Sequence, residues 1–199
     1  MAWAKLGTNT LTTVNADITV SSISDNKFII FLIHTLGKST MANDDGFRLG
    51  YGSVDTGANY SHRNSINGVA DVTGTSQTKI NQVLGGANAP LFRIGYIINI
   101  SNQEKLVIHH HIEQNTAGAG TAPVRFESVG KWVNTSNVID SVTQFSGGSA
   151  TFNTDSNVSV IGTTGYEVLY KIQNGTVFEE TDTNKSYIFN SSTGAWTQI

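Results

Sequence analysis

The amino-acid sequence predicts an all-β protein: a jelly-roll-like antiparallel β-sandwich followed by a small C-terminal β appendage. Three observations predict this fold class. Thr, Ser, Asn and Gly supply 82 of the 199 residues, whereas Asp, Glu, Lys and Arg supply only 14%, and this composition favours strands and turns over helices. Sustained helical periodicity is hard to find along the chain. Short β-branched runs bounded by Gly, Asn, Asp and Ser recur throughout, as in sandwich proteins.

A change of composition at Gly162–Gly165 predicts two parts, a sandwich domain over residues 1–165 and an appendage over residues 166–199. In the first part we expect strands, in chain order, at residues 3–11, 18–21, 28–36, 47–51, 59–63, 78–83, 91–100, 105–113, 124–133, 138–145 and 158–161. This number and spacing of short strands is typical of a Greek-key sandwich.

The most apolar strand covers residues 28–33 and is apolar on both of its faces. A half-exposed antiparallel strand should alternate instead. Either loops of the same chain cover the outer face of this strand or a neighbouring subunit does. On the second alternative Phe28, Ile29, Phe31 and Ile33 are interface residues, and the chain forms a symmetric homo-oligomer, which we predict to be a trimer.

Residues 91–113 predict a hairpin with its turn at Ser101–Glu104. One strand has apolar residues at every second position from 92 to 100, and the other has Leu106, Ile108 and Ile112 in one alternation. Because side chains alternate between the two faces of a strand, we expect these apolar sets to face the core.

Three consecutive histidines follow in the second strand of this hairpin. His109, His111 and Glu113 should share the strand face opposite to His110. Imidazole and carboxylate groups in such a row could bind a transition metal if a third ligand or a symmetry mate came near, so these three residues are the metal candidates. We expect instead a polar solvated or interface face, with His110 in the core, and no bound metal or cofactor.

The sequence predicts no enzyme and no catalytic residue. Gly37–Ser39 resembles the end of a phosphate-binding loop but lacks its first glycine and a following helix. No G-x-S-x-G nucleophile elbow occurs. Asp44 and Asp45 lack the spacing of an EF-hand loop, and we interpret them as carboxylates that cap their own turn.

Charge and targeting patterns exclude several partners. The formal net charge is −3 and no run of Lys or Arg occurs, so we expect no nucleic-acid partner. The N-terminus lacks an apolar signal region and no window reaches about 18 apolar residues, so we expect neither a signal peptide nor membrane insertion. With no cysteine, the fold cannot use disulfides or thiolate metal sites.

The C-terminal part, residues 166–199, predicts a small meander with strands at residues 168–173, 176–179, 185–189 and 196–199. Its first turn is Asn174–Gly175, a strong hairpin signal. The aromatic residues Phe178, Tyr187, Phe189 and Trp196 exceed what a short solvated tail should expose. This part either packs on the main domain or docks on a partner, and we expect docking through these aromatic residues.

Two stretches resemble virion proteins. Residues 149–162, SATFNTDSNVSVIG, resemble the last strand of small β-sandwich structural proteins from tailed bacteriophages. Residues 174–189, NGTVFEETDTNKSYIF, with the later Trp196, are similar to C-terminal segments of marine phage virion proteins. Tyr60–Arg63 with Gly68, and Gly130–Trp132, fit the same likeness.

This resemblance implies a structural protein of the virion that assembles symmetrically and is made in the host cytoplasm. We predict a capsid decoration or head-fibre component whose partners are its own copies and other virion proteins, such as the major capsid protein. The alternatives are a tail or adsorption component and a carbohydrate-binding adhesin for a host-surface glycan. A glycan hydrolase ranks third, because nothing in the sequence pairs two carboxylates.

Overall fold

The computed structural model describes residues 3–39, 45–81, 89–114, 116–164, 173–190 and 192–199. The chain divides into two compact units, Trp3–Gly165 and a second unit that contains Tyr166–Ile199. Within the described ranges no helix forms, and hence none that is long and apolar enough to cross a membrane.

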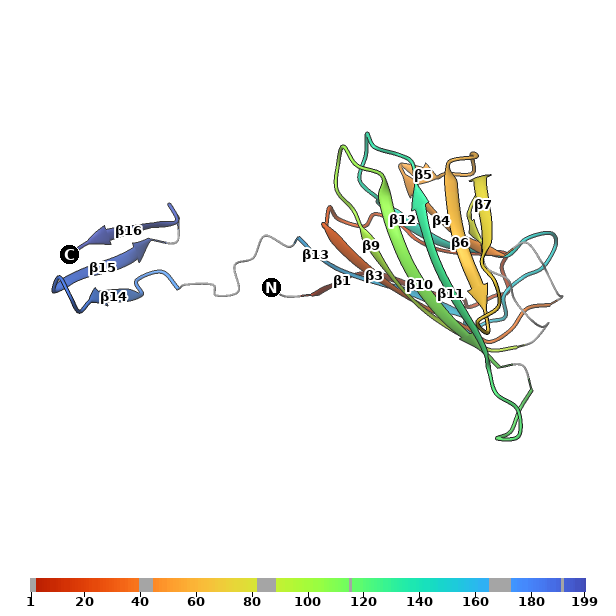
Figure 1. Ribbon diagram of the computed structural model, residues 1–199. Helices are drawn as coiled ribbons and strands as arrows, with labels where there is room; N and C mark the ends of the chain where they lie inside the picture. Colours follow the sequence, from red (N-terminus) through yellow and green to blue (C-terminus); the bar gives the residue numbers. More distant parts are fainter. Residues whose placement is uncertain (1–2, 40–44, 82–88, 115, 165–172, 191) are drawn as a thin grey trace. The chain divides into compact units, whose positions relative to one another are not determined.

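The first unit contains two antiparallel sheets (Figure 1). The large sheet consists, in spatial order, of β1 (Ala4–Thr10), β13 (Asn157–Thr163), β3 (Phe28–Thr35), β9 (Leu91–Ile98), β10 (Lys105–Glu113), β11 (Val124–Trp132), β6 (Tyr60–Ile66) and β7 (Val72–Gln77). The small sheet consists of β2 (Asp17–Val20), β12 (Ser141–Phe145), β4 (Gly46–Tyr51) and β5 (Ser53–Val54), with β8 (Ile80–Asn81) also paired to β4.

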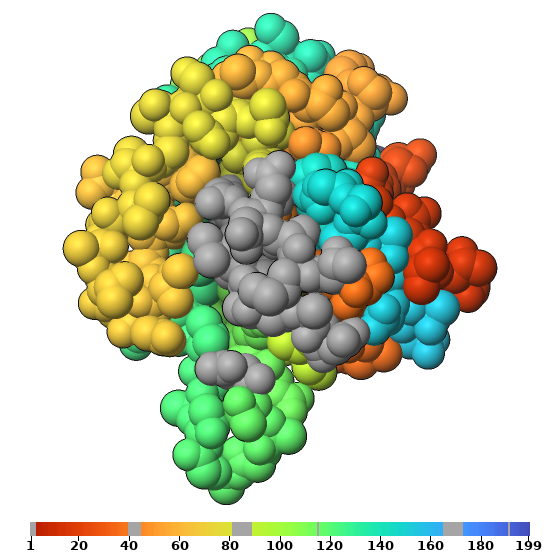
Figure 2. Space-filling view, turned by 90° about the vertical axis from the view of Figure 1, so that its right-hand side faces the viewer, coloured from red at the N-terminus to blue at the C-terminus, as the bar shows by residue number. Residues whose placement is uncertain are grey.

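This architecture confirms the predicted fold class. From β1 to β4 the chain crosses between the two sheets at every connection, as in jelly-roll-like sandwiches, and β9, β10 and β11 then form a meander within the large sheet. In Figure 1 the large sheet lies in front of the small one. The connection between β10 and β11, drawn in green, projects away from both sheets (Figures 1 and 2).

The hydrophobic core lies between the two sheets. Strand β3 contributes Ile29, Phe31 and Ile33, which are fully buried, while the alternate side chains point outward and are partly exposed. The rest of this core cluster is Leu11, Ile18, Val20, Ile23, Phe47, Leu49, Tyr60, Ile80, Ile97, Val107, Trp132, Ile139, Val142, Phe152, Val158 and Val160. Burial of this apolar surface is the main force that holds the sheets together.

The predicted strands of the first part are found, with ends that differ by a few residues. The predicted strand at residues 78–83 is represented by β8, and residues 82 and 83 lie outside the described ranges. Strand β7 was not predicted, because Val72 is its only large apolar residue. It follows the Asn67–Gly68 turn, where both residues have positive φ, 51° and 79°, the backbone of a two-residue hairpin turn.

A close contact in the core explains one glycine. Gly95 of β9 faces the ring of Phe31, and a Cβ atom at this position would lie 2.1 Å from the ring's Cζ. We therefore expect Gly95→Ala to lower the free energy of unfolding by about 1–3 kcal/mol through overpacking. Chemical denaturation measures this loss, and Gly120→Ala is the matched control because a Cβ there meets no atom within 4 Å. Equal stability of the two variants would contradict the packing argument.

The second unit contains a three-stranded antiparallel sheet of β14 (Val177–Glu180), β15 (Lys185–Asn190) and β16 (Ala195–Gln198). These are the last three predicted strands of the C-terminal part. The strand predicted at residues 168–173 lies almost wholly outside the described residues.

Candidate functional site: the outer side of the large sheet

The outward side of the large sheet carries apolar residues in rows that run across the strands. In the central row, Ile161 pairs with Ile30 and Ile30 with Tyr96. Tyr96 in turn pairs with Ile108, and Ile108 with Val129. Five adjacent strands therefore place five apolar side chains side by side on the surface of the molecule.

Further apolar residues extend this row on β3, β9 and β10. We define the outer apolar face as Phe28, Ile30, Leu32, Phe92, Ile94, Tyr96, Ile98, Leu106, Ile108, Ile112, Val129 and Ile161. Six of these side chains are between 46% and 56% exposed, which by itself offers roughly 500–600 Å² of apolar surface. A contiguous patch of this size on a soluble protein usually marks a contact site.

Two grooves lie on the outer apolar face, one on each side of a ridge formed by Leu106 and Ile108. The first groove has a volume of about 430 Å³, and its other lining residues include Trp3, Phe28 and Tyr96. The second groove has a volume of about 480 Å³ and runs between β10, β11 and the β6–β7 hairpin. The surface is therefore corrugated and not flat.

The exposure of this face shows that the sequence prediction for the hairpin at residues 91–113 was inverted. The apolar set of Leu106, Ile108 and Ile112 faces outward, and Phe92 and Tyr96 do so on β9. The inward positions of β10 are Lys105, Val107, His109, His111 and Glu113, all buried. Inside the sandwich, Lys105 finds hydrogen-bond acceptors, and the rings of His109 and His111 pack against aromatic rings.

Lys105 shows how such a partner set works. Its Nζ donates hydrogen bonds to the carbonyl oxygens of Ile100 (2.8 Å), Gln103 (2.7 Å) and Asn134 (3.1 Å). Three acceptors match the three donors of an ammonium group. Burial nevertheless lowers the pKa of Lys105 below its ordinary value. This lysine anchors the β9–β10 turn against the segment that follows β11.

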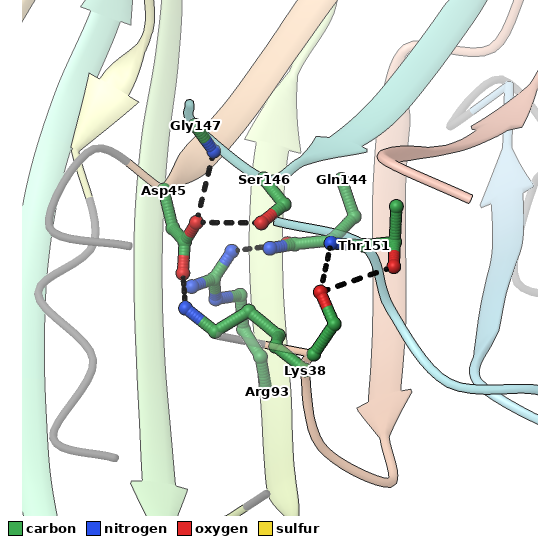
Figure 3. A network of polar contacts seen from close by, with 8 residues as sticks. Lys38, Asp45, Arg93, Gln144, Ser146, Gly147 and Thr151 are labelled. Atoms are coloured by element: carbon green, nitrogen blue, oxygen red, sulfur yellow. Dashed lines mark hydrogen bonds and ion pairs between the residues drawn. The ribbon is translucent and has the colours of Figure 1, made fainter. Parts of the chain in front are cut away.

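A buried polar network lies deeper between the sheets (Figure 3). The Lys38 ammonium pairs with the Asp45 carboxylate, and both side chains are almost completely buried. The other carboxylate oxygen of Asp45 accepts hydrogen bonds from Ser146 Oγ (3.1 Å) and Gly147 N (3.0 Å). Asp45 therefore ties the start of β4 to the segment after β12. The prediction that Asp45 caps its own turn was wrong, because its carboxylate is buried and binds Lys38, Ser146 and Gly147. Asp44 lies outside the described residues.

Arg93 belongs to the same network. Its Nη1 donates to Gln144 Oε1 at 2.7 Å, and its Cζ lies 5.7 Å from the centre of the Phe47 ring. Burial lowers the pKa of Arg93 to about 9, although the negative charge of Asp45 acts in the opposite direction. The guanidinium Nε and Nη2 have no hydrogen-bond partner among the described residues. A fully buried cation is thus held by one amide, one ring and one nearby carboxylate.

The histidine row also lies in the core. His109, His111 and Glu113 share one face as predicted, but that face is buried and His110 is the exposed member. The ring of His109 meets Phe47 edge-on at 5.1 Å between centroids, and the His111 ring stacks on Phe126 at 4.4 Å. The prediction of a solvated or interface row, with His110 in the core, was therefore wrong.

These histidines pack as aromatic rings in the core. Burial holds the pKa of His109 well below its ordinary value, and the nearby positive charge of Arg93 acts in the same direction. Neither ring nitrogen of His109 has a hydrogen-bond partner within the described ranges. The part of the chain that the structure describes contains no group of three His, Cys, Asp or Glu side chains placed to hold a metal ion.

The other predicted interface residues fall into two groups. Ile29, Phe31 and Ile33 belong to the core of their own sandwich, because β3 is central in the large sheet and faces the small sheet. Of the four residues predicted on this strand, only Phe28 lies on the outer apolar face, partly exposed. The double-sided apolarity of β3 thus reflects one core side and one side on the outer apolar face.

The predicted aromatic residues of the second unit form a cluster on its three-stranded sheet. The Phe178 ring lies 6.4 Å from Tyr187 and 6.1 Å from Trp196, and Phe189 lies 5.2 Å from Trp196, between ring centroids. Phe178 and Trp196 are exposed. A sheet of three strands with 4, 6 and 4 residues is too small to bury these rings between two layers.

Sequence reasoning missed the buried cations. The burial of Arg93 could have been predicted from its position. It lies on the same face of an otherwise apolar strand as Leu91 and Ile97. Its partner Gln144 is 51 residues away, so no local pattern could identify it.

Comparisons with protein-family models, curated proteins and solved structures found no match.

Proposed function

We propose that this protein is a non-enzymatic structural protein of a tailed-phage virion, where it serves as a capsid decoration or head-fibre component. The observation that carries this proposal is the outer apolar face, a large apolar surface of a β-sandwich with corrugated relief. The resemblance of residues 149–162 and 174–189 to segments of phage structural proteins supports the same assignment. The protein would occur in the virion as a homo-oligomer, in contact with other virion proteins such as the major capsid protein.

The distribution of polar groups favours assembly over catalysis. Arg93, Asp45 and His109, whose chemistry could serve a reaction, lie inside the sandwich at 0% exposure, where a substrate has no access. The surface outside them is rich in apolar side chains that contact other proteins well but supply no acid, base or nucleophile. The work of such a surface is binding.

Immunogold electron microscopy tests the proposal. Antibodies against the purified chain are applied to intact virus particles from the source culture, and particles treated with pre-immune serum are the control. We expect gold on the heads. Gold confined to the tails would favour a tail or adsorption component instead, and unlabelled particles that also lack the chain in mass spectrometry would overturn a virion role.

The aromatic cluster of the second unit favours one alternative, a carbohydrate-binding adhesin. Exposed rings such as Phe178 and Trp196 can stack on the apolar faces of sugars. A glycan array with the full chain and with Trp196→Ala distinguishes the two. Binding that Trp196→Ala removes would support the adhesin, whereas no glycan signal together with labelled heads would support decoration.

A further inference from the structure

We propose that the outer apolar face is a self-association surface and that its occupant is the same face of a second copy of this chain. This inference rests on the proposed assembly function and names its partner. Three features of the described residues carry it: the size of the face, the charges at its borders and its relief.

The size of the face fits an ordinary protein interface. The six half-exposed side chains offer roughly 500–600 Å², and the partly buried members of the face add to this area. A specific interface buries about 800 Å² on each partner. One copy of the face is therefore large enough to hold a second copy without help from another region.

The borders of the face carry balanced charges. Along β11 and β6, three cations stand directly next to it, and each is paired with a carboxylate of its own chain: Lys131 with Glu104 (2.7 Å), Arg125 with Glu127 (3.6 Å) and Arg63 with Asp71 (3.4 Å). A surface bordered by charges of one sign would repel a second copy of itself. Here the three positive charges are matched by three negative charges.

The opposite border, on β13 and β1, is polar and carries one cation, Lys5, which is exposed and pairs with Ile161 of the face. Ser159 pairs with Leu32 of the face, and its Oγ lies 2.8 Å from Thr8 Oγ1. Asn157 Nδ2 donates to Thr8 Oγ1 (3.0 Å) and to Thr10 Oγ1 (2.7 Å). These hydroxyl and amide groups satisfy one another, so the single charge of Lys5 is all that β1 and β13 offer to a partner of opposite sign. The borders therefore favour a like partner over a strongly acidic or basic one.

The relief of the face is self-complementary. The ridge of Leu106 and Ile108 stands between two grooves of about 430 Å³ and 480 Å³. When two copies meet with opposed faces, the ridge of each can enter a groove of the other, as side chains interdigitate between packed sheets. A symmetric contact of this kind buries the same residues on both copies.

Site-directed cross-linking tests this proposal with high specificity, because the chain has no cysteine. In Ile108→Cys the new thiol lies in the centre of the face, and in the matched control Val14→Cys it lies at a similarly exposed apolar position outside the face. With a short bis-maleimide at micromolar protein concentration, we expect Ile108→Cys to give a covalent pair of chains and Val14→Cys to remain single. A single Ile108→Cys chain would overturn the proposal.

Analytical ultracentrifugation gives an independent readout on unmodified chains. We expect the wild type to sediment as a dimer, because a contact between two identical faces joins two copies. We expect Ile108→Lys to weaken this self-association by about 100-fold, with Val14→Lys as the control. Val129→Lys is the second variant, in case one lysine prevents folding, and thermal melts show which variants are folded. A monomeric wild type, or an oligomer that both folded lysine variants preserve, would overturn the proposal.

These results separate the inference from the function on which it rests. If the wild type is monomeric but antibodies against it label virus heads, the assembly function stands and the self-association fails. If the wild type is an oligomer through the outer apolar face but is absent from virus particles, the self-association stands and the virion role fails.

Discussion

Asp45→Asn should lower the free energy of unfolding by about 3–5 kcal/mol, the usual cost of breaking a buried ion pair from one side. The substitution keeps the size of the side chain and an oxygen that can accept from Ser146 and Gly147. It removes the negative charge that faces Lys38 and Arg93, two buried cations. Urea denaturation at neutral pH, followed by tryptophan fluorescence, measures the loss.

Asp71→Asn is the matched control for this prediction. Asp71 also pairs with a cation, Arg63, but at 3.4 Å with both side chains about half exposed. A solvent-screened pair of this kind contributes between 0 and about 1 kcal/mol. If Asp45→Asn and Asp71→Asn cost the same, the buried network does not stabilise the fold in the way described here.

The strands themselves could be predicted from local sequence. The ends of β10, Lys105 and Glu113, match the prediction, because a stretch without Gly, Pro, Asn or Asp is bounded by a turn at Ser101–Glu104 and by Gln114. Such boundaries depend on turn residues and side-chain shape, both of which are local properties. The same holds for the last three strands of the second unit.

The direction in which β10 faces could not be predicted from local sequence. Hydrophobicity alone places Leu106 and Ile108 inside, but Lys105 and Arg93 have acceptors supplied by Asn134 and Gln144. These partners come from other strands and loops, so the energy that makes the polar side the inner one is non-local. The orientation of a strand depends on the contacts of all its side chains with the rest of the fold. These contacts cannot be read from the sequence of the strand alone.

The orientation of β9 and β10, which is opposite to the predicted one, therefore explains both the buried polar groups and the outer apolar face. Because the polar side of β9 and β10 is buried against the small sheet, their apolar side must be the outer one. The outer apolar face thus coexists with a well-packed core, in which Phe31, Phe47 and Trp132 are buried. The proposed self-association surface lies on central strands of a hydrogen-bonded sheet, so binding should need little rearrangement, which lowers the entropic cost of assembly.

His109→Phe should raise the free energy of unfolding by about 1 kcal/mol at pH 7.5, because it replaces by carbon two buried ring nitrogens that have no hydrogen-bond partner among the described residues. The new ring keeps the contacts with Phe47 and Phe126, whose centroids lie 5.1 Å and 5.7 Å away. The advantage should grow on acidification. Burial and the charges of Arg93 and of the neighbouring histidines hold the pKa of His109 well below its ordinary value, so below about pH 6.5 the unfolded chain binds a proton here that the folded chain does not.

Each pH unit below 6.5 should therefore cost the wild type about 1.4 kcal/mol at this residue, until the pH reaches the pKa of the folded state. Between pH 7.5 and pH 4.5 the gap between His109→Phe and the wild type should widen, by at most about 2.7 kcal/mol. Carboxylates also titrate in this range, but they do so in both proteins, so the difference between the two urea-denaturation series isolates His109. His34→Gln is the control for the removal of a histidine, because the His34 side chain is exposed. A gap that stays constant with pH would mean that the folded protein accommodates a charged His109, and the account of a neutral aromatic core at this position would then be wrong.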